Sequence, residues 1–267
     1  MDNIDRSQYD DRGFVVVRGL YSEEEAQWYQ KHFMELRESG EHPGDMAGFD
    51  TTSDDPLVRY PRMIHMHRWD DASRDWLLSD RVSGVIRQLI DSEPLAVQTM
   101  LYFKPAGARG QALHQDNFYL RAAPGACVGV WMALDHVDEE NGCLQVVPGS
   151  HKLPLLCQED VDTSKSFTDK GLTLPEGMET VPIILNPGDV LFFHGMLIHG
   201  SFPNTSKDRF RRALIGHYVS AESEKVADYY WPVLNMQGNE VVLGDNPGGG
   251  PCGRWVEVDG TPHVEVA

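Results

Sequence analysis

Short apolar segments separated by turns dominate the middle of the chain. Between about residues 95 and 220, runs rich in Val, Ile, Leu and Phe alternate with Pro-Gly pairs and other turn formers, a pattern typical of short strands. The segments predicted as strands are 96–104, 112–119, 127–137, 143–147, 180–185, 189–194 and 210–219. Their spacing suits a β-sandwich or jelly roll rather than alternating β-α units. We therefore expect a mainly β core.

Helical patterns flank this core on its N-terminal side. After a short β-branched run at 13–17, Ser22 and Glu25 form a capping-box pattern that precedes apolar residues at helical spacing. A second helix is predicted from about Ser79 to Asp91, with apolar residues on one stripe. We expect one domain over residues 1–267, with a helical N-terminal part of about 1–92, the jelly-roll core at about 95–220 and a C-terminal extension of about 221–267. Residues 244–253 are rich in Gly and Pro and predict a surface loop. The long segment 152–178 is a candidate active-site lid, with a disordered insert as the alternative.

Composition and charge narrow the class of protein. The 267 residues are 41% hydrophobic and 24% charged, as in globular proteins with a substantial core. The start is polar and acidic and no apolar run reaches 18 residues, so we expect a soluble, cytoplasmic protein. The net charge of −18 opposes association with nucleic acid or with an anionic membrane. The expected partner is a small molecule, which local arginines could bind even if it is anionic.

The four cysteines contain no C-x-x-C pair, so a zinc ribbon is not indicated. In a chain of this size without secretion signals, we expect free buried thiols rather than disulfides.

The candidate chemistry centres on Leu113-His114-Gln115-Asp116. On an extended strand, His114 and Asp116 point to the same face and could share a metal ion. A second histidine from a distant strand would complete a 2-His-1-carboxylate triad, which leaves open positions on non-haem Fe(II). His194 and His199 both qualify, and the Gly-Ser pair after His199 favours it modestly because small residues allow close approach.

Other basic residues offer further roles. His65 and His67 lie in an arginine-rich segment whose cations would disfavour a divalent metal, so we interpret it as a substrate-facing or structural loop. An oxygenase with such a triad that uses 2-oxoglutarate needs a cation to hold the far carboxylate of this co-substrate, and a guanidinium suits that role. Arg209, Arg211 and Arg212 follow His199 by ten to thirteen residues and are the candidates, with a solvated basic rim as the alternative.

Several strings in a fixed order resemble the phytanoyl-CoA dioxygenase family of Fe(II)/2-oxoglutarate-dependent oxygenases. They are Met100–Pro105, Leu113–Asp116, Trp131–Asp135, Asn141–His151 and Phe192–Ser201. The resemblance implies a double-stranded β-helix (jelly-roll, cupin-like) core with flanking helices. It assigns His114, Asp116 and His199 as catalytic iron ligands.

The resemblance also implies a site for the co-substrate. It indicates Arg211 as the 2-oxoglutarate clamp, with Arg209 as an alternative because the preceding loop looks one residue longer than in the best-known relative. The other implied neighbours of the co-substrate are Met100, Trp131, Ser201, Gln98, Asn117 and Lys104, the last with a core or strand-edge role as the alternative. Related halogenating enzymes replace the carboxylate with a small residue, so Asp116 disfavours halogenation.

The expected function is a dioxygenase that uses Fe(II), 2-oxoglutarate and O2 to hydroxylate an unactivated C–H bond and releases succinate and CO2. Desaturation and ring formation are variants of this chemistry. Candidate substrate-lining segments are 56–70, 152–178 and 221–235, in which arginines would favour a carboxylate, phosphonate or acyl-CoA substrate. The alternative is a non-oxidative metal-binding jelly-roll protein, such as an isomerase, a lyase or a ligand-binding module.

Overall fold

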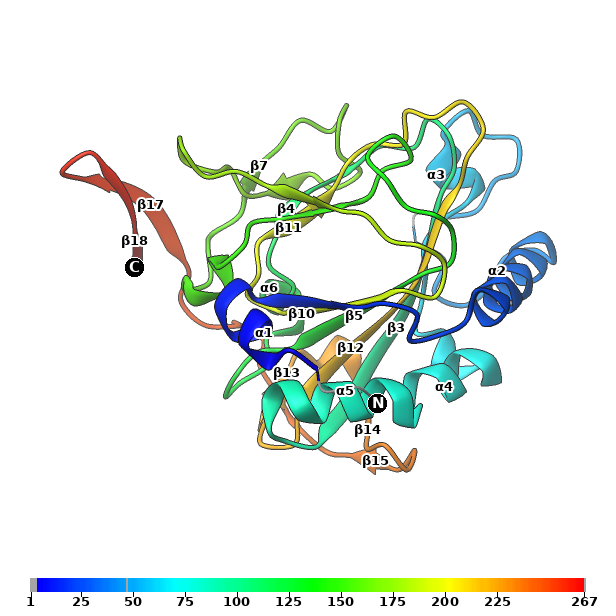
Figure 1. The fold of residues 1–267 in the computed structure, drawn as a ribbon, viewed down its shortest axis with the longest axis horizontal. Helices are drawn as coiled ribbons and strands as arrows, with labels where there is room; N and C mark the ends of the chain where they lie inside the picture. The colour runs from blue at the N-terminus through cyan, green and yellow to red at the C-terminus, as the bar shows by residue number, and fades with distance from the viewer. Residues whose placement is uncertain (1–3, 47, 267) are drawn as a thin grey trace.

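Two antiparallel sheets form the body of the molecule in a computed structural model, which describes residues 4–46 and 48–266 (Figure 1). The large sheet has the order β1-β10-β5-β12-β3-β14-β15, with β2 also paired to β3. Its strands are β1 (Phe14–Val17), β10 (Val190–His194), β5 (Val128–Ala133), β12 (Arg211–Ser220), β3 (Pro94–Lys104), β14 (Val233–Leu234), β15 (Glu240–Val241) and β2 (Met63–Ile64). The small sheet has the order β4 (Gln111–His114), β11 (His199–Ser201), β6 (Leu144–Val146) and β9 (Val181–Ile183). The predicted mainly β, jelly-roll architecture is confirmed.

Alternation along the strands of the large sheet builds a core on each of its faces. In β5, Trp131 and Ala133 belong to the apolar cluster shared with the small sheet, whereas Val130 and Met132 belong to the cluster shared with the helices. Because successive side chains of a strand point to opposite faces, one apolar run fills both cores. This explains why β5 is buried throughout its length.

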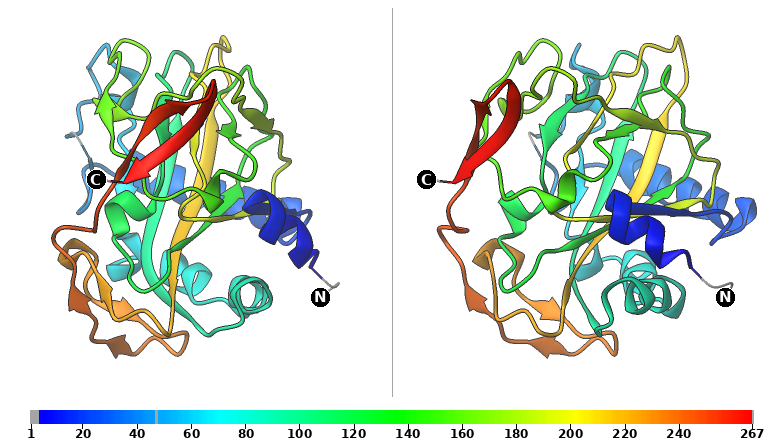
Figure 2. Two further views of the ribbon diagram at one scale, coloured as in Figure 1. Left: turned by 90° about the vertical axis from the view of Figure 1, so that its left-hand side faces the viewer. Right: turned by 60° about the vertical axis from the view of Figure 1, so that its left-hand side comes forward.

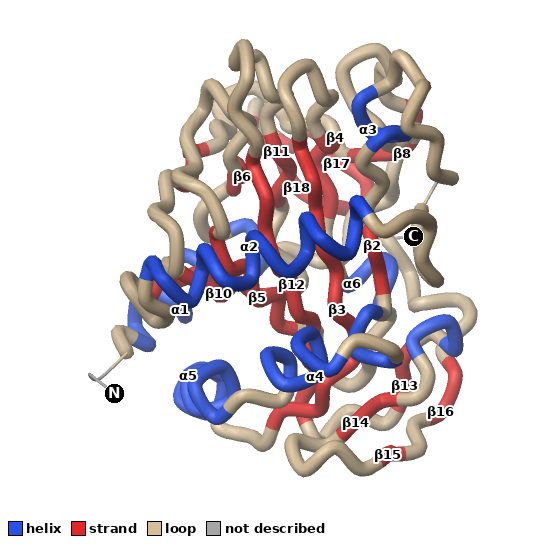
Figure 3. Tube along the Cα trace, turned by 90° about the vertical axis from the view of Figure 1, so that its right-hand side faces the viewer, coloured by secondary structure: helices blue, strands red, loops and turns tan. Residues whose placement is uncertain are grey.

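Helices cover the outer face of the large sheet (Figure 3). The longest are α2 (Glu23–Glu38) and α5 (Asp80–Ile90), and α1 (Arg6–Arg12) and α4 (Asp71–Leu77) have seven residues each. The single turn α3 (Pro56–Arg59) lies apart from this layer and contributes no residue to its core. The predicted capping box of α2 is present: Ser22 Oγ accepts from Glu25 N at 3.1 Å, and Ser22 N donates to Glu25 Oε2 at 2.8 Å. A cap of this kind stabilises a helix by about 1 kcal/mol. Ser79 caps α5 without a capping box, since its side chain accepts from the Val82 backbone N–H and no side chain among the described residues bonds to its own N–H.

The predicted strand 112–119 is wrong in its second half. Strand β4 ends at His114, and α6 (Asn117–Leu120) follows after Asp116, which has helical backbone angles. The backbone N–H groups of Tyr119 and Leu120 donate to the Asp116 carbonyl at 2.9 and 3.1 Å, so a helical turn replaces the sheet pairing. The other predicted core strands are present with shifted ends.

Short elements fill the long connections of the chain. Strands β7 (Glu159–Asp160) and β8 (Lys170–Gly171) pair within the segment 152–178, after the 3₁₀ turn η2 (Ser150–Lys152). Strands β13 (Lys225–Val226) and β16 (Gly244–Asp245) pair in parallel, and η1 (Met66–Arg68) and η3 (Asp228–Tyr230) are 3₁₀ turns. The predicted loop 244–253 therefore contains β16 and the first residue of another strand.

The C-terminal extension ends in a hairpin that the sequence did not predict. Strands β17 (Gly253–Val258) and β18 (Thr261–Val266) lie on the outside of the molecule, on the side away from α2 (Figure 2). The expectation of free thiols is wrong for two of the four cysteines. Cys157 and Cys252 form a disulfide that joins the segment 152–178 to the base of the hairpin, whereas Cys127 and Cys143 are free and buried. Two half-cystines 95 positions apart leave no local spacing signal.

Candidate metal centre

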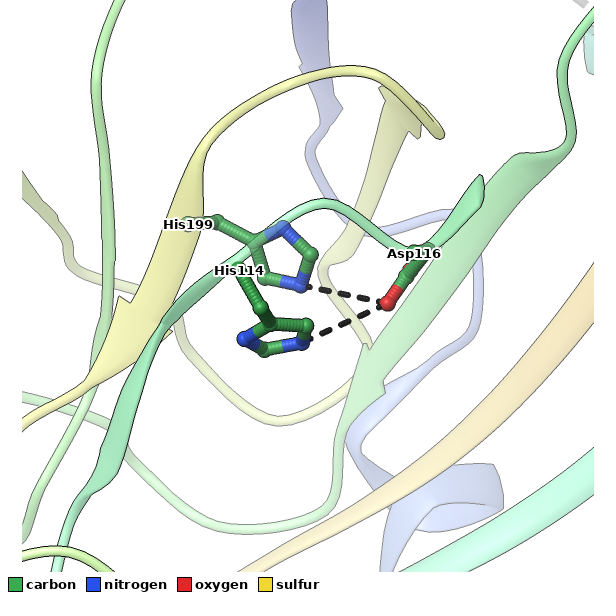
Figure 4. Close-up of side chains that lie close together, drawn as sticks. All are labelled: His114, Asp116 and His199. Carbon is green, nitrogen blue, oxygen red and sulfur yellow. Dashed lines mark ion pairs between the residues drawn. The ribbon is translucent and has the colours of Figure 1, made fainter. Parts of the chain in front are cut away.

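Two histidines and one aspartate converge between the sheets (Figure 4). His114 at the end of β4 lies directly opposite His199 at the start of β11, and their ring centroids are 4.2 Å apart. Asp116 Oδ1 lies 3.4 Å from His114 Nε2 and 3.6 Å from His199 Nε2. All three side chains are buried. They can bind one ion together because cross-strand register, and not sequence spacing, supplies the third ligand.

Hydrogen bonds aim both imidazoles at the centre of this group. His114 Nδ1 lies 2.9 Å from the Ala112 carbonyl, and His199 Nδ1 lies 3.0 Å from the Leu197 carbonyl. A carbonyl only accepts, so each Nδ1 carries the proton and each Nε2 presents its lone pair. Burial, with His114 close by, lowers the pKa of His199 to about 4, so this ring is neutral near pH 7.

The carboxylate is held in its ionised form. Burial alone would raise the pKa of Asp116. The positive charges that the His199 and His217 rings take up in acid, together with the hydrogen bond to His217, hold that pKa well below the ordinary 3.8. Two neutral imidazoles and one carboxylate are the donor set of non-haem Fe(II) centres. The residues present therefore fit such an ion.

His217 lies beside the three candidate ligands and was not predicted from the sequence. It is buried on β12, and its Nε2 lies 3.0 Å from Asp116 Oδ2, the carboxylate oxygen that is not shared with the two histidines. His217 forms no local motif with the ligand candidates, because it lies 101 positions after Asp116. No local pattern could have found this contact.

The other candidate histidines lie elsewhere. His194 Nδ1 accepts from the Met196 backbone N–H at 3.1 Å, and its ring packs near Tyr9 and His151. His65 precedes η1 and packs near Tyr229, and His67 lies within η1, where its Nδ1 is 3.0 Å from Thr99 Oγ1. The structure thus brings His199, and not His194, to His114 and Asp116.

A cavity of about 450 Å³ opens beside the three residues. The predicted co-substrate neighbours that line it are Gln98, Met100, Trp131, Ser201 and Arg211. Asn117 is not among the lining residues: its Oδ1 accepts from the Ala122 and Cys127 backbone N–H groups, and its Nδ2 donates to the Ala122 carbonyl. Lys104 lies behind Ser201 and donates to it from Nζ at 2.8 Å.

The structure distinguishes the three arginines that follow His199. Arg211 is buried, donates from Nε to the Gly142 carbonyl at 3.1 Å, and has no hydrogen-bond partner for one terminal nitrogen within the described residues. Its guanidinium also lies 5.3 Å from the Trp131 ring. By contrast, Arg209 pairs with Asp138 and Glu140 outside the cavity, and Arg212 pairs with Asp135. Burial lowers the pKa of Arg211 to about 10, so it stays positive near pH 7.

The family model described as phytanoyl-CoA dioxygenase (PhyH) matches residues 9–213. The chain belongs to the phytanoyl-CoA dioxygenase family. The resemblance stated from the sequence is therefore confirmed.

Two curated relatives and one solved structure illustrate the likeness. The chain is 33% identical to "Phytanoyl-CoA dioxygenase 1" of Oryza sativa subsp. japonica, over 62% of this chain and 59% of that protein. It is 30% identical to "2-aminoethylphosphonate dioxygenase" of an uncultured bacterium (HF130_AEPn_1), over 84% of each. The crystal structure of the epimerase SnoN in complex with Fe³⁺, alpha ketoglutarate and nogalamycin RO has the same fold, with a TM-score of 0.67, 22% identity and coverage of 82% of this chain and 83% of that one.

None of the helices in residues 4–46 and 48–266 of this phytanoyl-CoA dioxygenase family member has the length and apolar character needed to cross a membrane.

Proposed function

We propose that this protein is an Fe(II)- and 2-oxoglutarate-dependent oxygenase that hydroxylates an unactivated C–H bond of a small molecule. The proposal is carried by the buried group of His114, Asp116 and His199, which shares one cavity with Arg211. One terminal nitrogen of the Arg211 guanidinium has no hydrogen-bond partner among the described residues and can donate to a ligand. Membership of a dioxygenase family supports it further. The overall reaction would convert 2-oxoglutarate, O2 and R–H into succinate, CO2 and R–OH.

The chain's own residues would divide the work. His114, Asp116 and His199 would hold Fe(II), which when bound supplies O2 activation coupled to oxidative decarboxylation. Arg211 would hold the far carboxylate of 2-oxoglutarate by a charge-assisted hydrogen bond. Trp131 and Met100 line the same cavity and would exclude water from this end of it.

An anionic or acyl-type substrate suits the rest of the cavity. Of the arginines in the segment 56–70, Arg62 lines the cavity, whereas Arg59 donates to the Ser53 carbonyl and Arg68 to the Trp231 carbonyl. Within the described chain Arg62 has no carboxylate partner: it donates to Tyr102 Oη at 3.1 Å. The aromatic wall includes Phe118, Tyr119, Tyr229 and Tyr230. A volume of about 450 Å³ suits a small molecule or one end of a longer one.

The first experiment tests metal and co-substrate binding. Anaerobic addition of Fe(II) and 2-oxoglutarate should give a weak visible charge-transfer band, which His114→Ala or Asp116→Ala should abolish. His194→Ala is the matched control and should keep the band, because that ring lies outside the group. If no band appears and no compound tried stimulates succinate release, the oxygenase is rejected and the non-oxidative alternative is favoured.

A second experiment tests the substrate class. Once a screen for substrate-stimulated succinate release has found a substrate, Arg62→Gln should weaken the apparent affinity for an anionic one and should change the apparent affinity for the co-substrate little. Arg59→Gln is the control, since its guanidinium is bonded to the Ser53 carbonyl. A weaker apparent affinity for the co-substrate alone would instead assign Arg62 to the 2-oxoglutarate site.

A further inference from the structure

A fully buried lysine lies directly behind the cavity. Lys104 is 1% exposed at the end of β3 and is the register partner of Arg211 on β12. Its ammonium donates to Ser201 Oγ at 2.8 Å and to the Phe202 carbonyl at 2.6 Å. No carboxylate of the described residues pairs with Lys104 or with Arg211 at ion-pair distance. Two buried basic side chains thus lie on neighbouring strands without an acidic partner in the described part of the protein.

The hydrogen bonds at Ser201 fix the role of its hydroxyl. Its oxygen accepts from Lys104 Nζ and also from the Gln111 backbone N–H at 3.2 Å. A serine hydroxyl has two acceptor lone pairs and one proton. Both lone pairs are taken, so the proton remains for a donor bond. Since Ser201 lines the cavity together with Arg211, that proton is available to an acceptor in the cavity.

We propose that Lys104 is a positioning residue of the co-substrate site, which makes Ser201 a donor toward the far carboxylate of 2-oxoglutarate. This inference rests on the proposed function. An ammonium group can only donate, so it cannot accept the serine proton and leaves the hydroxyl pointed at the ligand. The bound carboxylate would then receive bonds from Ser201 and Arg211, and its negative charge would favour the ammonium form of Lys104.

The surroundings of Lys104 pack tightly against its side chain. Gly142 has a φ of +88°, and a Cβ on it would come within 2.8 Å of Lys104 Cδ and 2.7 Å of the Phe202 carbonyl oxygen. The Gly142 carbonyl also accepts from Arg211 Nε. Burial, followed by the charge of Arg211, lowers the pKa of Lys104 well below its ordinary 10.5. A nearby carboxylate opposes that shift.

Calorimetric titration of the Fe(II)-loaded full chain under argon tests the inference with two ligands. One is 2-oxoglutarate, and the other is 2-oxobutyrate, which has the same 2-oxo acid end but lacks the far carboxylate. Lys104→Met should weaken 2-oxoglutarate binding by about tenfold or more, the effect of losing a charged hydrogen-bond network, and should leave 2-oxobutyrate binding nearly unchanged. Lys207→Met is the matched control, because it makes the same substitution at an exposed lysine in the loop between β11 and β12.

A double-mutant cycle tests whether Lys104 acts through Ser201. In a Ser201→Ala background, Lys104→Met should have little further effect on 2-oxoglutarate affinity. Should Lys104→Met fail to fold, Lys104→Gln replaces it. The carbonyl oxygen of a glutamine amide can accept the Ser201 hydroxyl proton, so that this proton no longer has to point into the cavity. That variant should again weaken 2-oxoglutarate binding and spare 2-oxobutyrate binding.

Four outcomes would overturn the inference or its basis. If Lys104→Met leaves the affinity for 2-oxoglutarate unchanged, Lys104 has no role in binding it. If the variant loses equal affinity for 2-oxoglutarate and 2-oxobutyrate, the role of Lys104 is a general structural one. Additive losses in the cycle mean that Lys104 does not act through Ser201. Failure of the wild-type protein to bind 2-oxoglutarate at all rejects the proposed function instead, so the two failures are distinguishable.

Discussion

His217 lies 3.0 Å from Asp116, Nε2 to Oδ2, although the two residues are 101 positions apart. The aspartate is therefore fixed at both oxygens, because Oδ1 faces His114 and His199 while Oδ2 faces the third imidazole. A carboxylate held in this way loses little further rotational freedom when it binds a metal ion.

Replacing His217 should weaken metal binding. His217→Phe removes the bond to Asp116 Oδ2 and should lower Fe(II) affinity by about 10- to 100-fold, the usual effect of losing a partner of a metal ligand. Anaerobic equilibrium dialysis measures this affinity. His136→Phe is the control because His136 is exposed. Equal affinities of the wild-type and His217→Phe proteins would show that the aspartate does not need its partner.

The two histidines that the sequence barely separated should behave differently. His199→Ala should abolish Fe(II) binding, because it removes one of the three facing donors. His194→Ala should retain it, because that ring accepts from the Met196 backbone outside the group. Electron paramagnetic resonance of the nitric oxide adduct reads out bound Fe(II) in each variant. Loss of the signal in His194→Ala alone would contradict the site described above.

The two candidate clamp arginines should also separate. Arg211→Gln should weaken the binding of 2-oxoglutarate by about two orders of magnitude, the effect of losing a buried charged partner. Arg209→Gln should leave that binding unchanged, since Arg209 pairs with Asp138 and Glu140 at a partly exposed position. Arg209→Gln should cost at most about 1 kcal/mol of stability, because exposed ion pairs contribute little. The reverse pattern in calorimetric titrations would exchange their roles.

Thiol reactivity should reveal the disulfide. Burial raises the pKa of Cys143 to about 11 and that of Cys127 well above 9, so both stay protonated and unreactive at pH 8. With Cys157 and Cys252 joined, the native protein should show no fast-reacting thiol toward a colorimetric disulfide reagent. Mild reduction should release two thiols, and urea with a reductant should expose all four. Two fast thiols without reductant would contradict the bond.

The sequence could predict those parts of the fold that depend on local pattern. The capping box at Ser22 and Glu25 predicted the start of α2, because both partners of the cap lie within one turn of each other. Apolar runs between Pro-Gly turns predicted the strands of the core. The strand prediction was wrong beyond His114, where a turn around Asp116 replaced the sheet pairing.

By itself, therefore, the sequence determined the mainly β class, the family and the pair of His114 and Asp116, since each depends on residues close together or on ordered strings. The tertiary structure decided which distant side chains meet. Register between β4 and β11 placed His199 rather than His194 at the centre, and the strand β12 brought both His217 and Arg211 to it. The fold also paired Cys157 with Cys252 and set Lys104 behind Ser201. These contacts join residues 85 to 101 positions apart, and only the packing of the folded chain brings such residues together.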